Sequence, residues 1–162
     1  IYTGAKFTRL YFKDCYIDGT TDFIFGPSTA LFEDCIIHSK RNSYVTAAST
    51  PKEAKYGYVF KHCKLTAEPG VDKVYLGRPW RPYAYTLFIE CELGKHIVLA
   101  GWHNWGKQSN EETARYMEYK NTGEGANASE RVAWSKQLTK KEAEAVTVDA
   151  IFRTQSNWNP ID

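Results

Sequence analysis

Asp22 is the first residue whose type and setting suit chemistry. It follows Gly19-Thr20-Thr21 and precedes the apolar run Phe23-Ile24-Phe25. A carboxylate beside an apolar strand is costly unless it is paired or faces a cleft, and a group placed in this way can serve as a nucleophile or a base. The same segment also suits an aspartate that only caps a turn. Both interpretations of Asp22 stay open on this segment alone.

Arg78 lies in the segment Leu76-Gly77-Arg78-Pro79-Trp80. Gly77 and Pro79 restrict the backbone on both sides, so the guanidinium is expected to have a fixed direction. Its planar fork can hold a carboxylate in one orientation, although an ordinary surface salt bridge is also compatible with the segment. Trp80 suits either stacking on a sugar ring or packing in a core.

A third candidate segment is Gly101-Trp102-His103-Asn104-Trp105. His103 can act as a base, but a histidine among tryptophans also serves as a structural hydrogen-bonding group. No Gly-x-Ser-x-Gly motif is present, which excludes the nucleophile elbow of serine esterases. No Cys-x-x-Cys pair or His/Cys cluster predicts a zinc site.

These candidate residues lie between copies of a repeated pattern. Each copy has an aromatic residue, two variable residues, a cysteine, one variable residue and then Ile or Leu. Apolar and polar residues alternate as in a strand with one buried face. Phe and Cys are an odd number of positions apart, so a bend or bulge is expected between them. The copies are Phe12–Ile17, Phe32–Ile37, Phe60–Leu65 and Phe88–Leu93.

A second apolar strand is expected after most copies, with Gly, Pro, Asn and Ser marking the turns. Short strands repeated at coil-length spacing predict a stacked solenoid, and no copy shows the period of a helical repeat. The predicted second strands are Asp22–Phe25, Tyr44–Ala47, Val74–Leu76 and Ile97–Ala100.

The cysteines of the repeat allow two interpretations. They can form a column of small buried thiols. Alternatively, since neighbouring coils lie about 4.8 Å apart, Cys15 and Cys35 are within reach of a disulfide in an oxidising compartment.

The last part of the chain departs from the repeat. We expect one domain over residues 1–162, with coils over about 1–120 and a loop and short-helix tail over about 121–162. The predicted elements are a strand at Glu111–Tyr119, a helix at Lys140–Val146 capped by Thr139, a second short helix at Asp149–Phe152, and an aromatic anchor in a turn at Asn157–Pro160.

Composition narrows the class of protein. The net charge of +2 and the absence of a Lys/Arg run give no indication of nucleic-acid binding. No apolar run is long enough to span a membrane. Aromatic residues make up 15% of the chain, which suits either sugar binding or a large aromatic core.

Taken together, these segments resemble the pectin methylesterase (pectinesterase) family over nearly the whole chain. Later segments agree with the same resemblance. The matching segments are Gly19–Gly26, Leu76–Trp80, Gly101-Trp102, Tyr119–Gly123 with Gly125-Ala126, and Arg131–Trp134.

The resemblance implies an all-β fold, a right-handed single-stranded parallel β-helix. It also implies hydrolysis of the methyl ester at C6 of galacturonate residues in pectin, which releases methanol and leaves pectate. Asp22 matches the nucleophile that forms an acyl-enzyme, and Arg78 matches the arginine that orients it. Trp80, Phe25 and Trp102 match walls of the substrate groove. No metal or organic cofactor is implied.

The resemblance further implies methylated pectin as partner and a secreted or periplasmic location. In the family, a Gln-Asp-Thr-Leu-Tyr segment supplies the general acid/base, and Ile1-Tyr2-Thr3-Gly4 resembles the residues directly after Gln-Asp-Thr. We therefore expect the N-terminal half of the same protein to be a partner, and this chain alone to be weak in catalysis.

Two other functions stay open on the sequence. One is a non-catalytic β-helix that binds polygalacturonate. The other is a different β-helix pectinase, but the calcium-binding carboxylates of a lyase and the grouped aspartates of a polygalacturonase do not stand out around Asp22.

Overall fold

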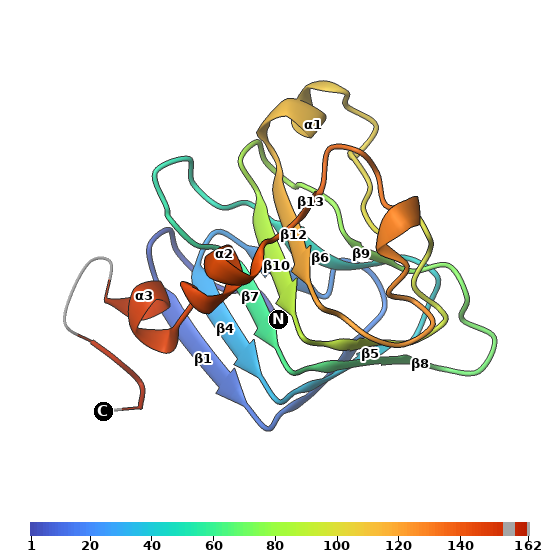
Figure 1. Ribbon diagram of the computed structural model, residues 1–162, viewed down its shortest axis with the longest axis horizontal. Helices are drawn as coiled ribbons and strands as arrows, with labels where there is room; N and C mark the ends of the chain where they lie inside the picture. Colours follow the sequence, from blue (N-terminus) through green and yellow to red (C-terminus); the bar gives the residue numbers. More distant parts are fainter. Residues whose placement is uncertain (154–157, 162) are drawn as a thin grey trace.

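The computed structural model describes residues 1–153 and 158–161, and it consists mainly of short parallel strands arranged in successive coils (Figure 1). The strands form three sheets, with the orders β1-β4-β7-β10-β12-β13, β11-β8-β5-β2 and β3-β6-β9. Neighbouring strands in each sheet come from successive coils and pair in parallel. This is the stacked solenoid that the repeat predicted, in the form of the parallel β-helix that the resemblance implied.

The element bounds follow the predicted repeat closely. The strands are β1 Arg9–Lys13, β2 Tyr16–Gly19, β3 Ile24–Gly26, β4 Thr29–Glu33, β5 Ile36–Ser39, β6 Tyr44–Ala48, β7 Tyr58–Lys61, β8 Lys64–Ala67, β9 Tyr75–Gly77, β10 Tyr85–Ile89, β11 Glu92–Leu93, β12 Arg115–Tyr119 and β13 Lys136–Gln137. The helices are α1 Ser109–Thr113, α2 Lys140–Glu144 and α3 Val148–Phe152, with a 3₁₀ turn, η1, at Ala128–Glu130.

The bend expected inside each repeat is a single residue in the left-handed backbone region. In the second repeat, Phe32 lies in β4, Asp34 has a φ of 54°, and Cys35 leads into β5. This residue turns the chain at the corner of the coil, so that Phe32 and Cys35 both enter the core. The equivalent corner residues are Asp14 at 53°, His62 at 55° and Glu90 at 52°.

Identical side chains stack along the axis of the solenoid. Neighbouring phenylalanine rings of the repeat are nearly parallel, with centroid separations of 4.8, 4.5 and 4.4 Å from Phe12 to Phe88. The cysteines form a parallel column of free thiols. The thiol of Cys63 lies 3.4 Å from the carbonyl oxygen of Phe32 in the preceding coil. The structure thus has the thiol column, the first of the two interpretations.

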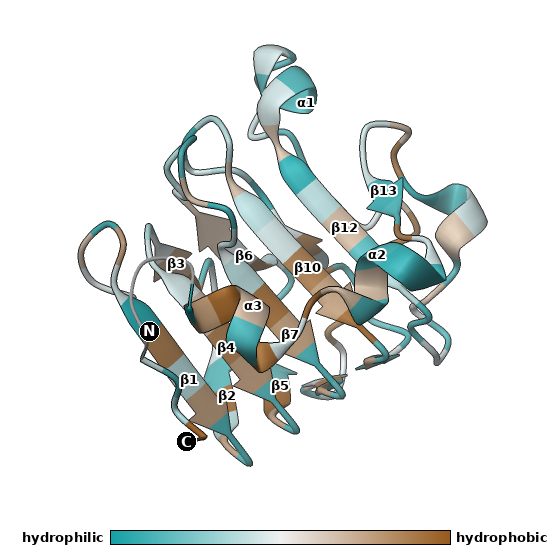
Figure 2. Cartoon of the chain, turned by 60° about the vertical axis from the view of Figure 1, so that its left-hand side comes forward, coloured by the Kyte–Doolittle hydropathy of each residue, from teal (hydrophilic) through white to brown (hydrophobic). Residues whose placement is uncertain are grey.

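The tail covers the outer face of the largest sheet. Ile151 and Phe152 of α3 are buried against Leu31, Val59 and Leu87. Figure 2 shows α3 lying over the apolar strands of this sheet. The predicted cap of α2 is confirmed, because Thr139 accepts a hydrogen bond from the Glu142 amide and the Glu142 carboxylate accepts one in return.

Some predicted elements were wrong in detail. Residues 111–113 belong to α1 rather than to a strand, and β12 begins only at Arg115. The segment Ile97–Ala100 forms only an isolated bridge between Ile97 and Val74, because the chain turns there instead of running straight. The largest sheet gains β13 beyond residue 120, where the tail was expected to begin. In the predicted turn at 157–160, Asn157 lies outside the described residues.

None of the helices in residues 1–153 and 158–161 combines the length and the apolar character that a bilayer crossing requires.

Candidate active site

Asp22 lies at the corner that leads into β3, not inside the strand. Its φ is 48°, in the left-handed region that aspartate tolerates better than most residues. Its amide donates a 2.9 Å hydrogen bond to the carbonyl oxygen of Tyr44 in the next coil. The side chain is 19% exposed. The fold therefore fixes the backbone of Asp22 and leaves part of its side chain accessible.

Arg78, predicted as the partner of Asp22, reaches this carboxylate from two coils away. Its Nε donates to Oδ1 at 3.0 Å, and its terminal NH2 group donates to Oδ2 at 2.7 Å. This is the bidentate geometry that orients a carboxylate most firmly. Since the side chains of both residues are about 20% exposed, the pair lies at the boundary between core and solvent.

The guanidinium of Arg78 is held between two aromatic rings. Its Cζ atom lies 3.8 Å from the ring centroid of Tyr44 and 3.8 Å from that of Trp105. Planar guanidinium groups stack on such faces, so the fork cannot rotate away from Asp22. Burial alone lowers the pKa of Arg78, but the hydrogen bonds and the charge of Asp22 outweigh it, and the pKa is raised.

The backbone beside Arg78 passes very close to the neighbouring coil. A Cβ atom on Gly77 would overlap Oγ1 of the buried Thr46, so only glycine fits there. The amide of Arg78 then donates to the carbonyl oxygen of Thr46 at 3.0 Å. The expectation that Gly77 restricts the backbone is met by close packing instead of by a special φ.

His103 forms no hydrogen bond with Asp22 among the described residues. Its ring packs edge-on against Tyr44 and Tyr75, and its Nδ1 accepts a 3.0 Å hydrogen bond from the Trp105 amide. Burial, with a smaller contribution from the charge of Arg78, lowers the pKa of His103. The imidazole is therefore neutral at neutral pH and serves to position Trp105.

Asp22 lines a pocket of about 300 Å³. Phe25 and Trp80, which the resemblance matched to walls of a substrate groove, both line this pocket, and their rings pack edge to face with a centroid separation of 6.0 Å. Trp80 is 37% exposed, so its ring is available to a ligand. The complete lining is Thr21, Asp22, Phe25, Ala47, Trp80 and Trp105.

Trp102 does not take the place that the sequence predicted for it. It is 1% exposed and stacks on the buried Tyr116 with a centroid separation of 4.3 Å. The reason is the turn that ends at Gly101, whose φ is 71°, after which Trp102 pairs with Gly77 of the preceding coil and its side chain enters the core. The pocket wall is formed by Trp105, which the sequence indicated only as part of the aromatic cluster. Tyr44, the other ring on Arg78, had no signal beyond its place in a predicted strand.

A buried ion pair between Arg131 and Glu118 contacts the side chain of Trp102. Arg131 donates to Glu118 from Nε at 2.8 Å, and both side chains are 3% exposed. Glu118 also accepts a hydrogen bond from Nε1 of Trp102 at 3.3 Å. The pair therefore ties the C-terminal tail to the loop that carries Trp105.

The described residues contain no cluster of three or more His, Cys, Asp or Glu side chains placed to hold a metal ion. The side chains around the pocket instead supply one oriented carboxylate, one cation and aromatic walls. This combination suits attack by the carboxylate on an uncharged carbonyl group beside a sugar ring.

Comparison with known proteins identifies the same family that the sequence resembles. The family model "Pectinesterase" matches residues 1–155. Pectinesterase 31 of Arabidopsis thaliana is 45% identical over 83% of this chain. A solved structure of carrot pectin methylesterase superposes with a TM-score of 0.86 at 33% identity over 94% of this chain. A pectin methylesterase in complex with a hexasaccharide superposes with a TM-score of 0.78 at 29% identity, again over 94% of this chain.

The chain spans about half the length of these proteins. It covers 43% of pectinesterase 31 and 53% of the carrot structure. The fold predicted from the sequence, a right-handed parallel β-helix, is confirmed by these neighbours.

Proposed function

The chain belongs to the pectinesterase family, and we propose that, as part of a complete β-helix, it hydrolyses the methyl esters of galacturonate in pectin. The observation that carries the proposal is the bidentate pair of Asp22 and Arg78 at the edge of an aromatic pocket. A binding module has no need of a carboxylate held at a fixed angle by a clamped guanidinium.

In the proposed reaction, an oxygen of Asp22 attacks the ester carbonyl carbon. Each oxygen accepts one hydrogen bond from Arg78 and keeps a lone pair free for attack. The tetrahedral intermediate expels methoxide, which takes a proton and leaves as methanol. The galacturonyl group stays on Asp22 as a mixed anhydride. Water then attacks its galacturonyl carbonyl, which releases the free galacturonate and regenerates Asp22.

The proton for methanol requires a general acid. The resemblance assigns it to an aspartate that would precede Ile1, in the coil next to β3. We propose that the N-terminal half of the same protein supplies this coil.

The pairing beside β3 supports this partner. The amide of Phe25 donates to the carbonyl oxygen of Ile1 at 3.0 Å, and the amide of Thr3 donates to the carbonyl oxygen of Phe25 at 2.9 Å. Residues 1–3 therefore run parallel to β3, one coil before it. A segment joined to Ile1 would enter the same coil, on the side of the sheet that carries Asp22.

The edge of the solenoid also supports the N-terminal half of the same protein as the partner. Among the described residues, β1 and β2 each pair with another strand on one side only. Unpaired strand edges invite pairing with another chain segment. Phe12, at the first position of the phenylalanine stack, is only partly buried, whereas Phe32 in the next coil is fully buried. Another coil would complete both the sheets and the stack.

Methanol release from methylated pectin tests the proposed activity. We expect the chain joined to its N-terminal coils to release methanol and to lower the pH of the mixture as carboxyl groups form. The chain alone should release far less. A joined protein that binds pectin but releases no methanol would show that the polygalacturonate-binding function is the correct one.

Replacement of Arg78 by lysine tests the orienting role of the guanidinium. Lysine keeps the positive charge but loses the fork and the stacking between Tyr44 and Trp105. We expect kcat/KM to fall by about 10²-fold in the joined protein, with thermal stability nearly unchanged. The replacement Arg41→Lys, at an exposed arginine, is the matched control and should leave kcat/KM unaltered. Equal rates for Arg78→Lys and the parent would contradict the orienting role.

The location follows from the substrate. A polysaccharide of high mass does not cross a membrane, so an enzyme that acts on it must meet it outside the cytoplasm. We therefore propose that the protein is secreted or periplasmic.

A further inference from the structure

Arg115 connects two loops, one of which carries Trp80 of the pocket at Asp22. It is the first residue of β12, and its side chain is partly buried. Each nitrogen of its guanidinium donates to a backbone carbonyl oxygen in a loop. Nε and Nη2 reach Tyr83 at 3.0 and 2.6 Å, Nη1 reaches Ala54 at 2.7 Å, and Nη2 also reaches Pro51 at 3.0 Å.

These hydrogen bonds join two tight turns that belong to different coils. The first turn, residues 51–54, lies between β6 and β7 and is closed by a 3.2 Å hydrogen bond between its end residues. The second turn, residues 81–84, lies between β9 and β10 and is closed in the same way at 3.3 Å. Because β7, β10 and β12 are neighbours in the largest sheet, the side chain of Arg115 links three successive coils.

The second turn has a strained backbone at Tyr83. Pro82 is followed by Tyr83 with a φ of 67°, and proline before a residue of positive φ is the pattern of a type II turn. Glycine is the usual residue there, since a side chain is strained in the left-handed region. The two hydrogen bonds from Arg115 offset this strain, because a charged donor binds a carbonyl more strongly than a neutral one. Burial lowers the pKa of Arg115, but an arginine stays protonated in proteins.

Trp80 lies between two anchors in this loop. Its amide donates to the carbonyl oxygen of Ala48 at 3.0 Å, and three residues later the carbonyl of Tyr83 is held by Arg115. The ring of Trp80 is 37% exposed and lines the pocket of Asp22. The position of the turn at residues 81–84 therefore affects where this ring stands in the pocket.

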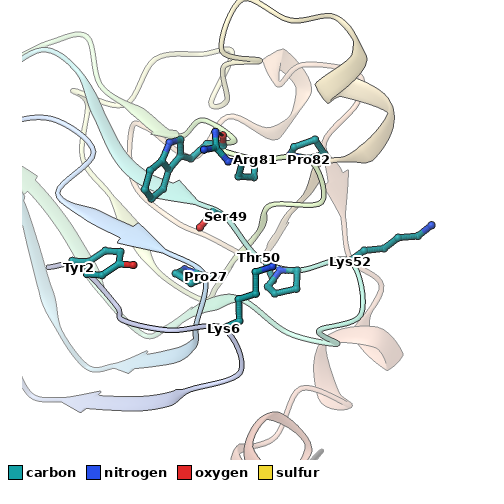
Figure 3. Close-up of a pocket in the computed structure, with 10 residues that line it drawn as sticks. Tyr2, Lys6, Pro27, Ser49, Thr50, Lys52, Arg81 and Pro82 are labelled. Carbon is teal, nitrogen blue, oxygen red and sulfur yellow. Dashed lines mark hydrogen bonds between the residues drawn. The ribbon is translucent and has the colours of Figure 1, made fainter.

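The two loops also line the neighbouring pocket of about 370 Å³ that Figure 3 shows. Thr50 and Lys52 come from the first loop, and Arg81 and Pro82 come from the second. Arg115 lines neither this pocket nor the pocket of Asp22. It connects the loops without a place in either wall, so any effect on a bound ligand must pass through the loops.

We propose that Arg115 is a positioning residue, which ties residues 81–84 to residues 51–54 and thereby holds the ring of Trp80 in place beside Asp22. The effect on catalysis rests on the proposed function, whereas the restraint on the two turns does not. Loss of the guanidinium frees both turns, and the ring of Trp80 then binds a sugar less well, while the pair of carboxylate and guanidinium at Asp22 stays intact.

Hydrogen exchange of the joined protein measures the restraint directly. The variant Arg115→Met keeps an aliphatic side chain and removes every donor. We expect the amides in residues 52–56 and 80–84 to exchange roughly tenfold faster than in the parent, because the turns open locally. Arg115→Lys is a milder variant that keeps the charge. Its compact ammonium reaches fewer of the carbonyls than the fork, so the same amides should exchange faster than in the parent.

The matched control for these variants is Val146→Ala. Val146 is buried under the tail on the outer face of the largest sheet and lines neither of the two pockets. Its replacement lowers the stability of the fold by leaving a cavity. Exchange in residues 52–56 and 80–84 should nevertheless match the parent, since both turns keep their hydrogen bonds to Arg115.

Kinetics of two single variants and their combination test whether Arg115 acts through Trp80. Arg115→Met should lower kcat/KM on methylated pectin roughly tenfold, mainly by raising KM, because a displaced ring weakens binding and leaves the reacting groups in place. In Arg115→Met/Trp80→Ala, the loss should equal that of Trp80→Ala alone within about twofold. A merely structural role would lower kcat instead, and the two losses would multiply.

Unchanged exchange in both turns would overturn the proposal for Arg115, and so would losses that multiply in the double variant. Absence of methanol from the joined protein would overturn only the esterase proposal. Exchange would then still measure the restraint on the turns, and the comparison of single and double variants would use binding of a methyl-esterified galacturonate oligomer in place of kcat/KM.

Discussion

Replacement of Asp22 by asparagine is expected to lower methanol release by roughly 10⁴- to 10⁶-fold in the joined protein. An amide is nearly the same size and tolerates the left-handed backbone at φ 48°. It is not a nucleophile, and its NH2 group cannot accept a hydrogen bond from Arg78. The loss should appear in kcat more than in KM, because Asp22 acts on the reacting carbon. Methanol measured over time with excess methylated pectin checks this result.

The matched control for Asp22→Asn is Asp34→Asn. Asp34 has a similar backbone, with a φ of 54°, but it lies exposed at another corner of the coil. This variant should keep the parent rate within about twofold, since its only ion pair among the described residues is with the exposed His62. If both variants lost activity equally, the effect would come from the coil corners and not from the nucleophile.

The second large effect is expected at the buried pair of Arg131 and Glu118. The replacement Arg131→Met leaves the carboxylate of Glu118, whose side chain is 3% exposed, without its charge partner. Such a loss costs about 3–5 kcal/mol in the free energy of unfolding. Arg131 also donates to the carbonyl oxygens of Gly125 and Leu99, which lose their partner as well. Urea unfolding followed by tryptophan fluorescence measures the change.

A second replacement separates charge burial from packing in this pair. In the double variant Arg131→Met/Glu118→Gln, no unpaired charge remains, and we expect much of the lost stability to return. The exposed control Arg41→Met should change the free energy of unfolding by less than about 0.5 kcal/mol. A loss below about 1 kcal/mol for Arg131→Met would mean that the ion pair does not hold the tail against the solenoid.

Much of the fold can be predicted from the sequence because a solenoid repeats its contacts. The phenylalanine and cysteine of each repeat pack on their counterparts in the neighbouring coil, so the spacing in the sequence reports the register in space. The helix caps of the tail are local in the same sense. The prediction at Thr139 needed only Glu142 three residues later.

The details that the sequence did not predict depend on contacts between coils. Trp102 and Trp105 have the same residue type and lie close together, and only the pairing of Trp102 with Gly77 of the preceding coil decides which of them is buried. The stack of Tyr44 on Arg78 joins residues from different coils, with no motif that connects them. α1 is a short helix of five polar residues after a loop, so no apolar pattern separates it from the strand β12 that follows.

The role of Asp22 is tested most directly by a single turnover with the joined protein in excess over a methyl-esterified galacturonate oligomer. Samples quenched in acid at increasing times are digested and measured by mass spectrometry. We expect methanol to appear together with a transient adduct on the peptide that carries Asp22, with the mass of the de-esterified oligomer less one water. An adduct on a different residue, formed at the rate of methanol release, would contradict this role.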